Sequence, residues 1–233
     1  MFGASQIVEA NSYRSQTNSQ GVVASRDSSA DRFERGTIRR IEAKEHVFCD
    51  GDPRTHVFRI EEGVVALSKL LGDGRRQIIE FAYPGDYIGL GTMREHIFDA
   101  QATCAAKVRC LSASALEQEA ARDAGLALKL YKAVSAELAA ARSLLVSVGQ
   151  QSAMERLSAF LLSLTARNAG TGGDENIVKL PMRRSDIADL LGLTIETVSR
   201  TITKLRTMRV IEVVRGTEVH ILDSDRLAEL AGQ

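Results

Sequence analysis

The side chains best suited to specific chemistry lie in one stretch near the C-terminus, RSDIADLLGLTIETVSRTITKLR, residues 184–206. A helix over residues 194–208 would present Ile195, Glu196, Ser199 and Arg200 on one outward face, because residues three and four apart share a side of a helix. Arginine can donate two hydrogen bonds to guanine, glutamate can accept one from the cytosine amino group, and isoleucine suits a thymine methyl. This face is therefore suited to reading base edges in the major groove of DNA.

The residues around this face predict a helix-turn-helix. Residues 185–191 form a short amphipathic helix with small Ala188 on its inner side, and Gly192 frees the turn that follows. Thr194 is a good N-cap for the second helix, since its hydroxyl can accept from the amide near Thr197. Three apolar residues spaced four and three apart fasten that helix to its core: Val198, Ile202 and Leu205.

The charge distribution agrees with a local nucleic-acid surface. The whole chain has a formal net charge of zero, but residues 180–209 hold six basic side chains against three acidic ones. Basic and hydroxyl side chains around a reading helix usually contact phosphates, which position a protein without specifying sequence. The expected phosphate contacts are Arg183, Arg184, Thr194, Thr203, Lys204, Arg206 and Arg215.

Two of these assignments have plain alternatives. Glu196 and Arg200 are four apart, so they could form a weak ion pair along the helix. Such a pair is compatible with base contact, because a glutamate that orients an arginine also shapes recognition. Residues 210–214 and 218–222 predict a two-stranded wing, with Arg215 at its tip either on a phosphate or simply exposed.

The first half of the chain predicts a different architecture. Residues 1–30 lack hydrophobic periodicity and are expected to form a flexible arm. Short apolar runs at 46–49, 57–60, 64–71 and 77–82 are separated by turn signals rich in Asp, Gly and Pro, and residues 102–111 would supply the closing strands. A β-roll over residues 31–116 follows, so the expected class is α+β.

A helical region follows the predicted β-roll. Helix-forming residues dominate from Ala113 to Arg167, and apolar residues recur there in steps of four and three. This heptad seam comprises Ala127, Tyr131, Val134, Leu138, Ala141, Leu145 and Val148. A seam this narrow favours a dimerisation helix over residues 117–150, although the helix could instead pack on its own β-roll. A second helix over 152–165 would then open the winged helix-turn-helix domain, residues 151–233.

Several classes of function and location are disfavoured. No apolar run is long enough for a membrane span and the first 30 residues have no signal-peptide core, so a cytoplasmic protein is expected. No phosphate-binding loop, nucleophile elbow or catalytic triad spacing argues for an enzyme. Cys49, Cys104 and Cys110 show no metal-binding or disulfide spacing and are expected to be free thiols, so no metal site is predicted.

Together these features resemble the CRP/FNR superfamily of bacterial regulators, over residues 40–230. The likeness rests on the ETVSR core at 196–200, on LLGDGRRQIIEF and YPGDYIGL in the β-roll, and on the order of the parts. It implies a homodimer that recruits RNA polymerase, with the loop at residues 72–76 as a candidate contact or a plain surface turn. A FixK-type activator of oxygen-limited metabolism is the nearest branch, and its target would be a TTG…CAA palindrome.

Departures from that family bear on regulation. Residues 85–90 lack the family's Gly-Glu pair, and residues 98–103 supply no arginine to neutralise a cyclic phosphodiester. Three cysteines, none before Cys49, are too few for an iron–sulfur cluster, and haem ligation by His46, His56 or His96 has little support. We therefore expect DNA binding without a cofactor. The alternative is a regulator whose β-roll binds a small effector or senses thiol oxidation.

Overall fold

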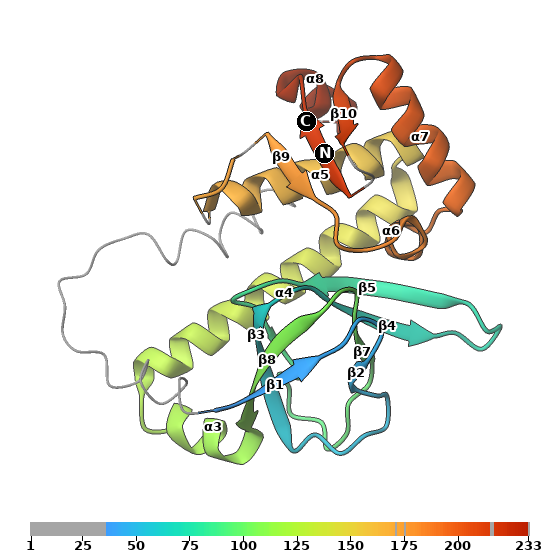
Figure 1. The fold of residues 1–233 in the computed structure, drawn as a ribbon. Coiled ribbons are helices and arrows are strands. Elements are labelled where there is room, and N and C mark those ends of the chain that lie inside the picture. The colour runs from blue at the N-terminus through green and yellow to red at the C-terminus, as the bar shows by residue number, and fades with distance from the viewer. Residues whose placement is uncertain (1–35, 171, 175, 215–216, 233) are drawn as a thin grey trace. The chain divides into compact units, whose positions relative to one another are not determined.

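The structure, a computed structural model, describes residues 36–170, 172–174, 176–214 and 217–232. The described chain forms two compact units, the first ending at Ser135 and the second beginning at Ala136. Strands dominate the first unit and helices the second (Figure 1), which confirms the α+β class. The flexible arm predicted for residues 1–30 lies outside the described residues.

The first unit is a β-roll of two antiparallel four-stranded sheets, ordered β1-β8-β3-β6 and β2-β7-β4-β5. The strands are β1 (Thr37–Ile41), β2 (His46–Phe48), β3 (His56–Glu62), β4 (Val65–Leu70), β5 (Arg76–Ala82), β6 (Tyr87–Ile88), β7 (Asp99–Ala102) and β8 (Ala106–Ser112). The predicted strands are present, and the predicted closing region is divided into β7 and β8. Sequence analysis missed β1 and β6, which are strands at the ends of one sheet.

The core of the β-roll is built from the inward residues of both sheets. Ile60, Val65, Ala100 and Val108 are fully buried there, and each comes from a different strand. Gly63 turns the chain between β3 and β4 with a φ of +80°, and a Cβ at this position would lie 2.6 Å from the Ala105 carbonyl oxygen. Only glycine fits this turn without distortion.

Two helices follow β8, where the sequence predicts one long helix. Helix α3 (Ala113–Ala120) is followed by α4 (Ala124–Gln150), so the start predicted at residue 117 falls inside α3. The break arises because Asp123 begins a new helix, its Oδ1 accepting from the backbone amides of Gly125 at 2.8 Å and Leu126 at 3.1 Å. Leu116 of α3 and Leu126 of α4 pack in one apolar cluster with Val57 of β3.

The second unit is a winged helix-turn-helix. Its elements are α5 (Ala153–Gly170), β9 (Ile177–Lys179), α6 (Arg184–Leu191), α7 (Ile195–Thr207), β10 (Ile211–Val214), β11 (Glu218–Ile221) and α8 (Ser224–Leu230). Helix α5 extends past the predicted end at residue 165, into the start of the glycine-rich stretch. The predicted wing hairpin is confirmed, and β9 adds a third strand to it by pairing with β11. Within the described residues, no helix has the length and apolarity that crossing a membrane requires.

Candidate DNA-binding interface

Helix α7 is held by its inner face. Val198 and Leu205 are completely buried and Ile202 is 6% exposed, as their spacing predicts. The Thr194 side chain accepts from the backbone amide of Thr197 at 3.2 Å, which confirms the expected N-cap. The N-cap fixes where α7 begins, and the buried stripe fixes the rotation of the helix about its own axis. The opposite face of α7 therefore points away from the core.

The turn between α6 and α7 is crowded. Gly192 adopts a φ of +62°, and a Cβ there would lie 3.3 Å from Cγ1 of Val148 at the end of α4. Arg156 of α5 donates to the carbonyl oxygen of Leu191 at 2.9 Å and to those of Val148 at 2.7 Å and Gln151 at 2.9 Å. One guanidinium therefore satisfies backbone acceptors at the C-terminal ends of both α4 and α6.

The predicted reading face lies on the outer side of α7. Ile195 is 47% exposed, Glu196 and Arg200 are exposed, and Ser199 is half-buried. A hydrogen bond from its own backbone amide, aided by the Thr194 side chain, lowers the pKa of Glu196, and the positive charge of Arg200 lowers this pKa further. Glu196 is thus an ionised acceptor at neutral pH, while Arg200 reaches Thr197 Oγ1 at 3.5 Å.

The expected phosphate contacts surround this face on two helices. Arg183, Arg184, Lys204 and Arg206 are all exposed. Arg184 of α6 donates to Ser199 Oγ at 3.3 Å, so it lies beside the reading face and connects α6 to α7. Arg183 precedes α6, where its backbone amide is held by the Asp186 carboxylate at 2.9 Å.

The remaining predicted phosphate contacts differ from one another. The Thr203 hydroxyl donates to the Ser199 carbonyl at 3.0 Å, so it must rotate before it can donate to a phosphate. Thr194 is exposed, and its hydroxyl oxygen serves as the N-cap of α7. Arg215, which the sequence predicts at the tip of the wing, lies outside the described residues.

The heptad seam of α4 is uncovered in the single chain. Tyr131 is 70% exposed, Leu138 48% and Leu145 75%, although all three are apolar enough to favour burial. Val134 and Val148 are exposed too, and Ala141 is half-buried. The inner side of the same helix is marked by buried Leu126, so the seam is distinct from the face that packs on α3 and the β-roll.

The candidate sensor groups of the β-roll differ in exposure: the three cysteines are half-buried, His96 is buried, and His46 and His56 are exposed. Burial, together with the charges of Asp52 and Asp99, raises the pKa of the Cys49 thiol, and burial raises the pKa of Cys110. A raised thiol pKa disfavours the thiolate that oxidants attack. His96 is 6% exposed and its ring stacks on Phe48 with centroids 3.6 Å apart, so it is a packed residue of the core edge.

Comparison with known proteins agrees with this architecture. Residues 38–123 match the cyclic nucleotide-binding domain family, and residues 155–230 match the Crp-like helix-turn-helix domain family. The nitrogen fixation regulation protein FixK of Bradyrhizobium diazoefficiens is 41% identical over 187 residues, which cover 80% of this chain and 78% of that protein. The transcriptional activatory protein AadR of Rhodopseudomonas palustris is 38% identical over 82% of this chain and 80% of its own length.

The chain belongs to the FixK-type branch of the CRP/FNR superfamily of transcription regulators. The structure of FixK2 from Bradyrhizobium japonicum aligns with a TM-score of 0.79 at 34% identity, covering 84% of this chain and 96% of that one. The expected family, its winged DNA-binding domain and its β-roll are thereby confirmed.

The cyclic nucleotide-binding match is one of fold, and the side chains do not fit a cyclic nucleotide. Within the described part of the β-roll, the buried polar and charged residues include Ser68 and His96 but neither lysine nor arginine. The enclosed guanidiniums of Arg54 and Arg109 are paired with Glu117 at 2.8 Å and Glu61 at 2.7 Å. A cyclic phosphodiester in this core would therefore lack a cation to neutralise it.

Sequence reasoning did not identify Arg156 or the contact of Arg184 with Ser199. Arg156 donates to three backbone carbonyls, and every residue has a backbone carbonyl, so the sequence does not indicate which of them Arg156 contacts. The Arg184 contact bridges two helices whose crossing the sequence alone does not define.

Substitution Gly192→Ala should lower the free energy of unfolding by about 1–2 kcal/mol, the usual penalty for an L-residue in left-handed backbone. The added methyl would also press on Val148. Urea denaturation measures the effect. The matched control is Gly72→Ala in an exposed β-roll turn, where a Cβ meets nothing within 4 Å and which should change stability by less than about 0.5 kcal/mol. Equal effects of the two substitutions would contradict the constraint at Gly192.

Proposed function

We propose that the protein is a homodimeric activator that binds a TTG…CAA-type palindrome through α7. The observation that carries this proposal is the outward face of α7, where Ile195, Glu196 and Arg200 are exposed above a completely buried Val198. Each of the three side chains suits one feature of a TTG half-site: Ile195 a thymine methyl, Arg200 the guanine, and Glu196 the cytosine opposite that guanine. Ser199 lies between them, half-buried, and its hydroxyl oxygen accepts from Arg184 at 3.3 Å.

The dimer supplies the symmetry that a palindrome requires. We infer that the exposed seam of α4, from Tyr131 to Val148, pairs with the same seam of a second copy, because heptad spacing brings apolar residues of two helices together. A twofold dimer would place its two α7 helices about 34 Å apart, one turn of B-DNA. The half-sites would then be read from the same side of the duplex.

The relatives and the β-roll both bear on how we propose that the protein is regulated. The relatives include the transcriptional activator protein Anr of Pseudomonas protegens and nitrogen fixation regulators, which supports a role in transcriptional activation, and we propose that the genes controlled are those of oxygen-limited metabolism. The core of the β-roll offers no cation to neutralise a cyclic phosphodiester, which argues for DNA binding without a small-molecule cofactor. The abundance or covalent modification of the protein would then set the level of transcription. Activation would proceed in the cytoplasm by contact with RNA polymerase, for which the loop at residues 72–76, between β4 and the start of β5, is a candidate surface.

Substitution Arg200→Ala should remove the preference for one base pair in each half-site, a loss of about 1–3 kcal/mol of discrimination per half-site. Arg184→Ala should instead weaken binding to all sequences alike and reduce the salt slope by about one per chain. Fluorescence anisotropy against a panel of single-base variants at several salt concentrations separates the two. Unchanged base preference in Arg200→Ala would refute the assignment of the reading face.

Substitution Leu138→Glu should convert the dimer to a monomer, since it places like charges opposite each other in an apolar seam. DNA affinity should fall with it, because one half-site alone remains bound. Sedimentation equilibrium measures the association. Ala139→Glu, at an exposed position of α4 outside the seam, is the matched control and should leave the dimer intact. A dimer that survives Leu138→Glu but is lost in Ala139→Glu would place the interface elsewhere on α4.

A further inference from the structure

A bulge in β2 brings two potential metal ligands to one side of the strand. Strand β2 pairs with β7 through His46 opposite Gln101 and Phe48 opposite Ala100, and the register shifts between these pairs. Consecutive residues Val47 and Phe48 are both buried, so the normal alternation is interrupted at this point. Cys49 therefore returns to the outer side of the sheet that also carries exposed His46.

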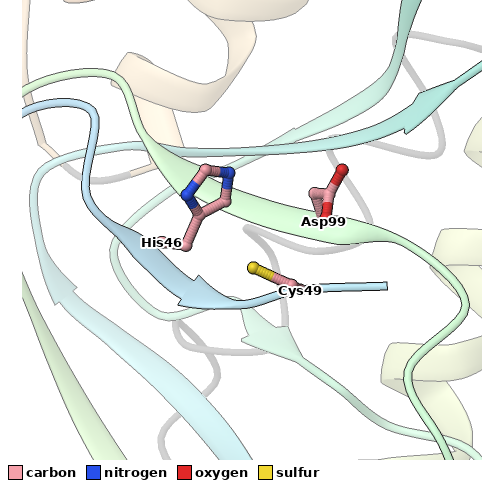
Figure 2. Close-up of side chains that lie close together, drawn as sticks. All are labelled: His46, Cys49 and Asp99. Carbon is pink, nitrogen blue, oxygen red and sulfur yellow. The ribbon is translucent and has the colours of Figure 1, made fainter. Parts of the chain in front are cut away.

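The neighbouring strand supplies a third ligand. Ala100 of β7 is completely buried, so the preceding residue, Asp99, projects away from the core. Figure 2 shows His46 and Cys49 on one segment of chain and Asp99 on the adjacent one. One ligand atom from each of these side chains lies within 4.8 Å of the other two.

The three donor types match a transition metal. Imidazole nitrogen, thiolate sulfur and carboxylate oxygen are all ligands of Zn²⁺, at roughly 2.0–2.3 Å from the ion. The three ligand atoms, now within 4.8 Å of one another, would have to close around the ion, and a water would complete a tetrahedron. Mg²⁺ and Ca²⁺ are poorer candidates, since they prefer oxygen ligands and larger coordination numbers.

The surrounding hydrogen bonds orient the Asp99 carboxylate and hold the backbone of Cys49. Asp99 Oδ1 accepts from the backbone amide of Asp50 at 3.0 Å, and the Cys49 amide donates to Asp52 Oδ2 at 2.8 Å. Two cations lie nearby: Lys69 donates to Asp50 Oδ2 at 2.6 Å, and Arg39 donates to the backbone carbonyls of His46 at 2.8 Å and Val47 at 3.0 Å. Outer partners of this kind hold ligating groups in place, and the Asp52 carboxylate adds negative charge that favours a cation.

We infer that His46, Cys49 and Asp99 form a binding site for one divalent transition-metal ion, with Zn²⁺ the best match. Binding would release the Cys49 thiol proton to solvent and form the metal–sulfur bond in its place. The ion would tie β2 to β7 within one sheet of the β-roll. No part of the DNA-binding proposal depends on this site.

The test titrates Co²⁺, and then Zn²⁺ in competition, into the reduced full-length chain after removal of metal by chelation. We expect one equivalent of Co²⁺ to produce a thiolate-to-metal charge-transfer band, which Zn²⁺ then abolishes. Cys49→Ser and Asp99→Asn, both close to isosteric, should each weaken binding by more than the roughly 10–100-fold that loss of an outer partner costs. Zn²⁺ should also raise the melting temperature of the original chain but not of these variants.

The matched control is Cys104→Ser, which removes a half-buried thiol outside the cluster and should leave affinity and stoichiometry unchanged. His46→Gln provides a third ligand variant at an exposed position, where the fold should tolerate substitution. Absence of the charge-transfer band in the original chain would overturn the inference. Undiminished affinity in folded Cys49→Ser, Asp99→Asn or His46→Gln would overturn it as well.

Discussion

The presentation of α7 depends on one crowded joint, where Arg156 and Gly192 meet the end of α4. Arg156 supplies donors to carbonyls that would otherwise be unsatisfied at two helix C-termini, and its positive charge complements the negative ends of both helix dipoles. Gly192 makes the left-handed turn there, with Val148 too close for a larger residue. The direction in which α7 leaves this joint decides which of its side chains can face DNA.

The same joint relates dimerisation to recognition. Val148 belongs to the seam predicted to meet a second copy, its carbonyl accepts from Arg156, and its side chain lies beside Gly192. Leu138 and Leu145 continue the seam along the same helix. The geometry that pairs two chains would therefore be transmitted to two α7 helices through packed side chains and charged hydrogen bonds.

The β-roll has the fold of a cyclic nucleotide-binding domain without a matching ligand site in its described core. Its family is that of cyclic nucleotide-binding domains, yet its core is apolar, and the enclosed Arg54 and Arg109 are committed to glutamates. The fold is retained while the charge that would hold a cyclic phosphate is missing from the described core. The proposed metal ligands, His46, Cys49 and Asp99, lie instead at the outer face of β2 and β7.

Sequence analysis predicted the features that periodicity encodes. The buried stripe through Val198 and Leu205, the Thr194 cap and the regular strands all follow from spacing that a single element imposes. Short strands such as β6 and β9 escaped prediction because two or three residues show no period. The cluster of His46, Cys49 and Asp99 also escaped, because it needs a bulge in β2 and the pairing of β2 with β7, a strand distant in the sequence. The carbonyl contacts of Arg156 escaped as well.

The central claim is that two α7 helices read DNA as a symmetric pair. Selection of the full-length protein against random duplexes, with and without cell extract, tests it most directly. The account predicts enrichment of a TTG…CAA-type palindrome whose half-sites are centred about one helical turn apart, with no requirement for extract. Enrichment of an asymmetric single site would contradict it, whereas a palindrome enriched only when extract is present would contradict the independence from a cofactor.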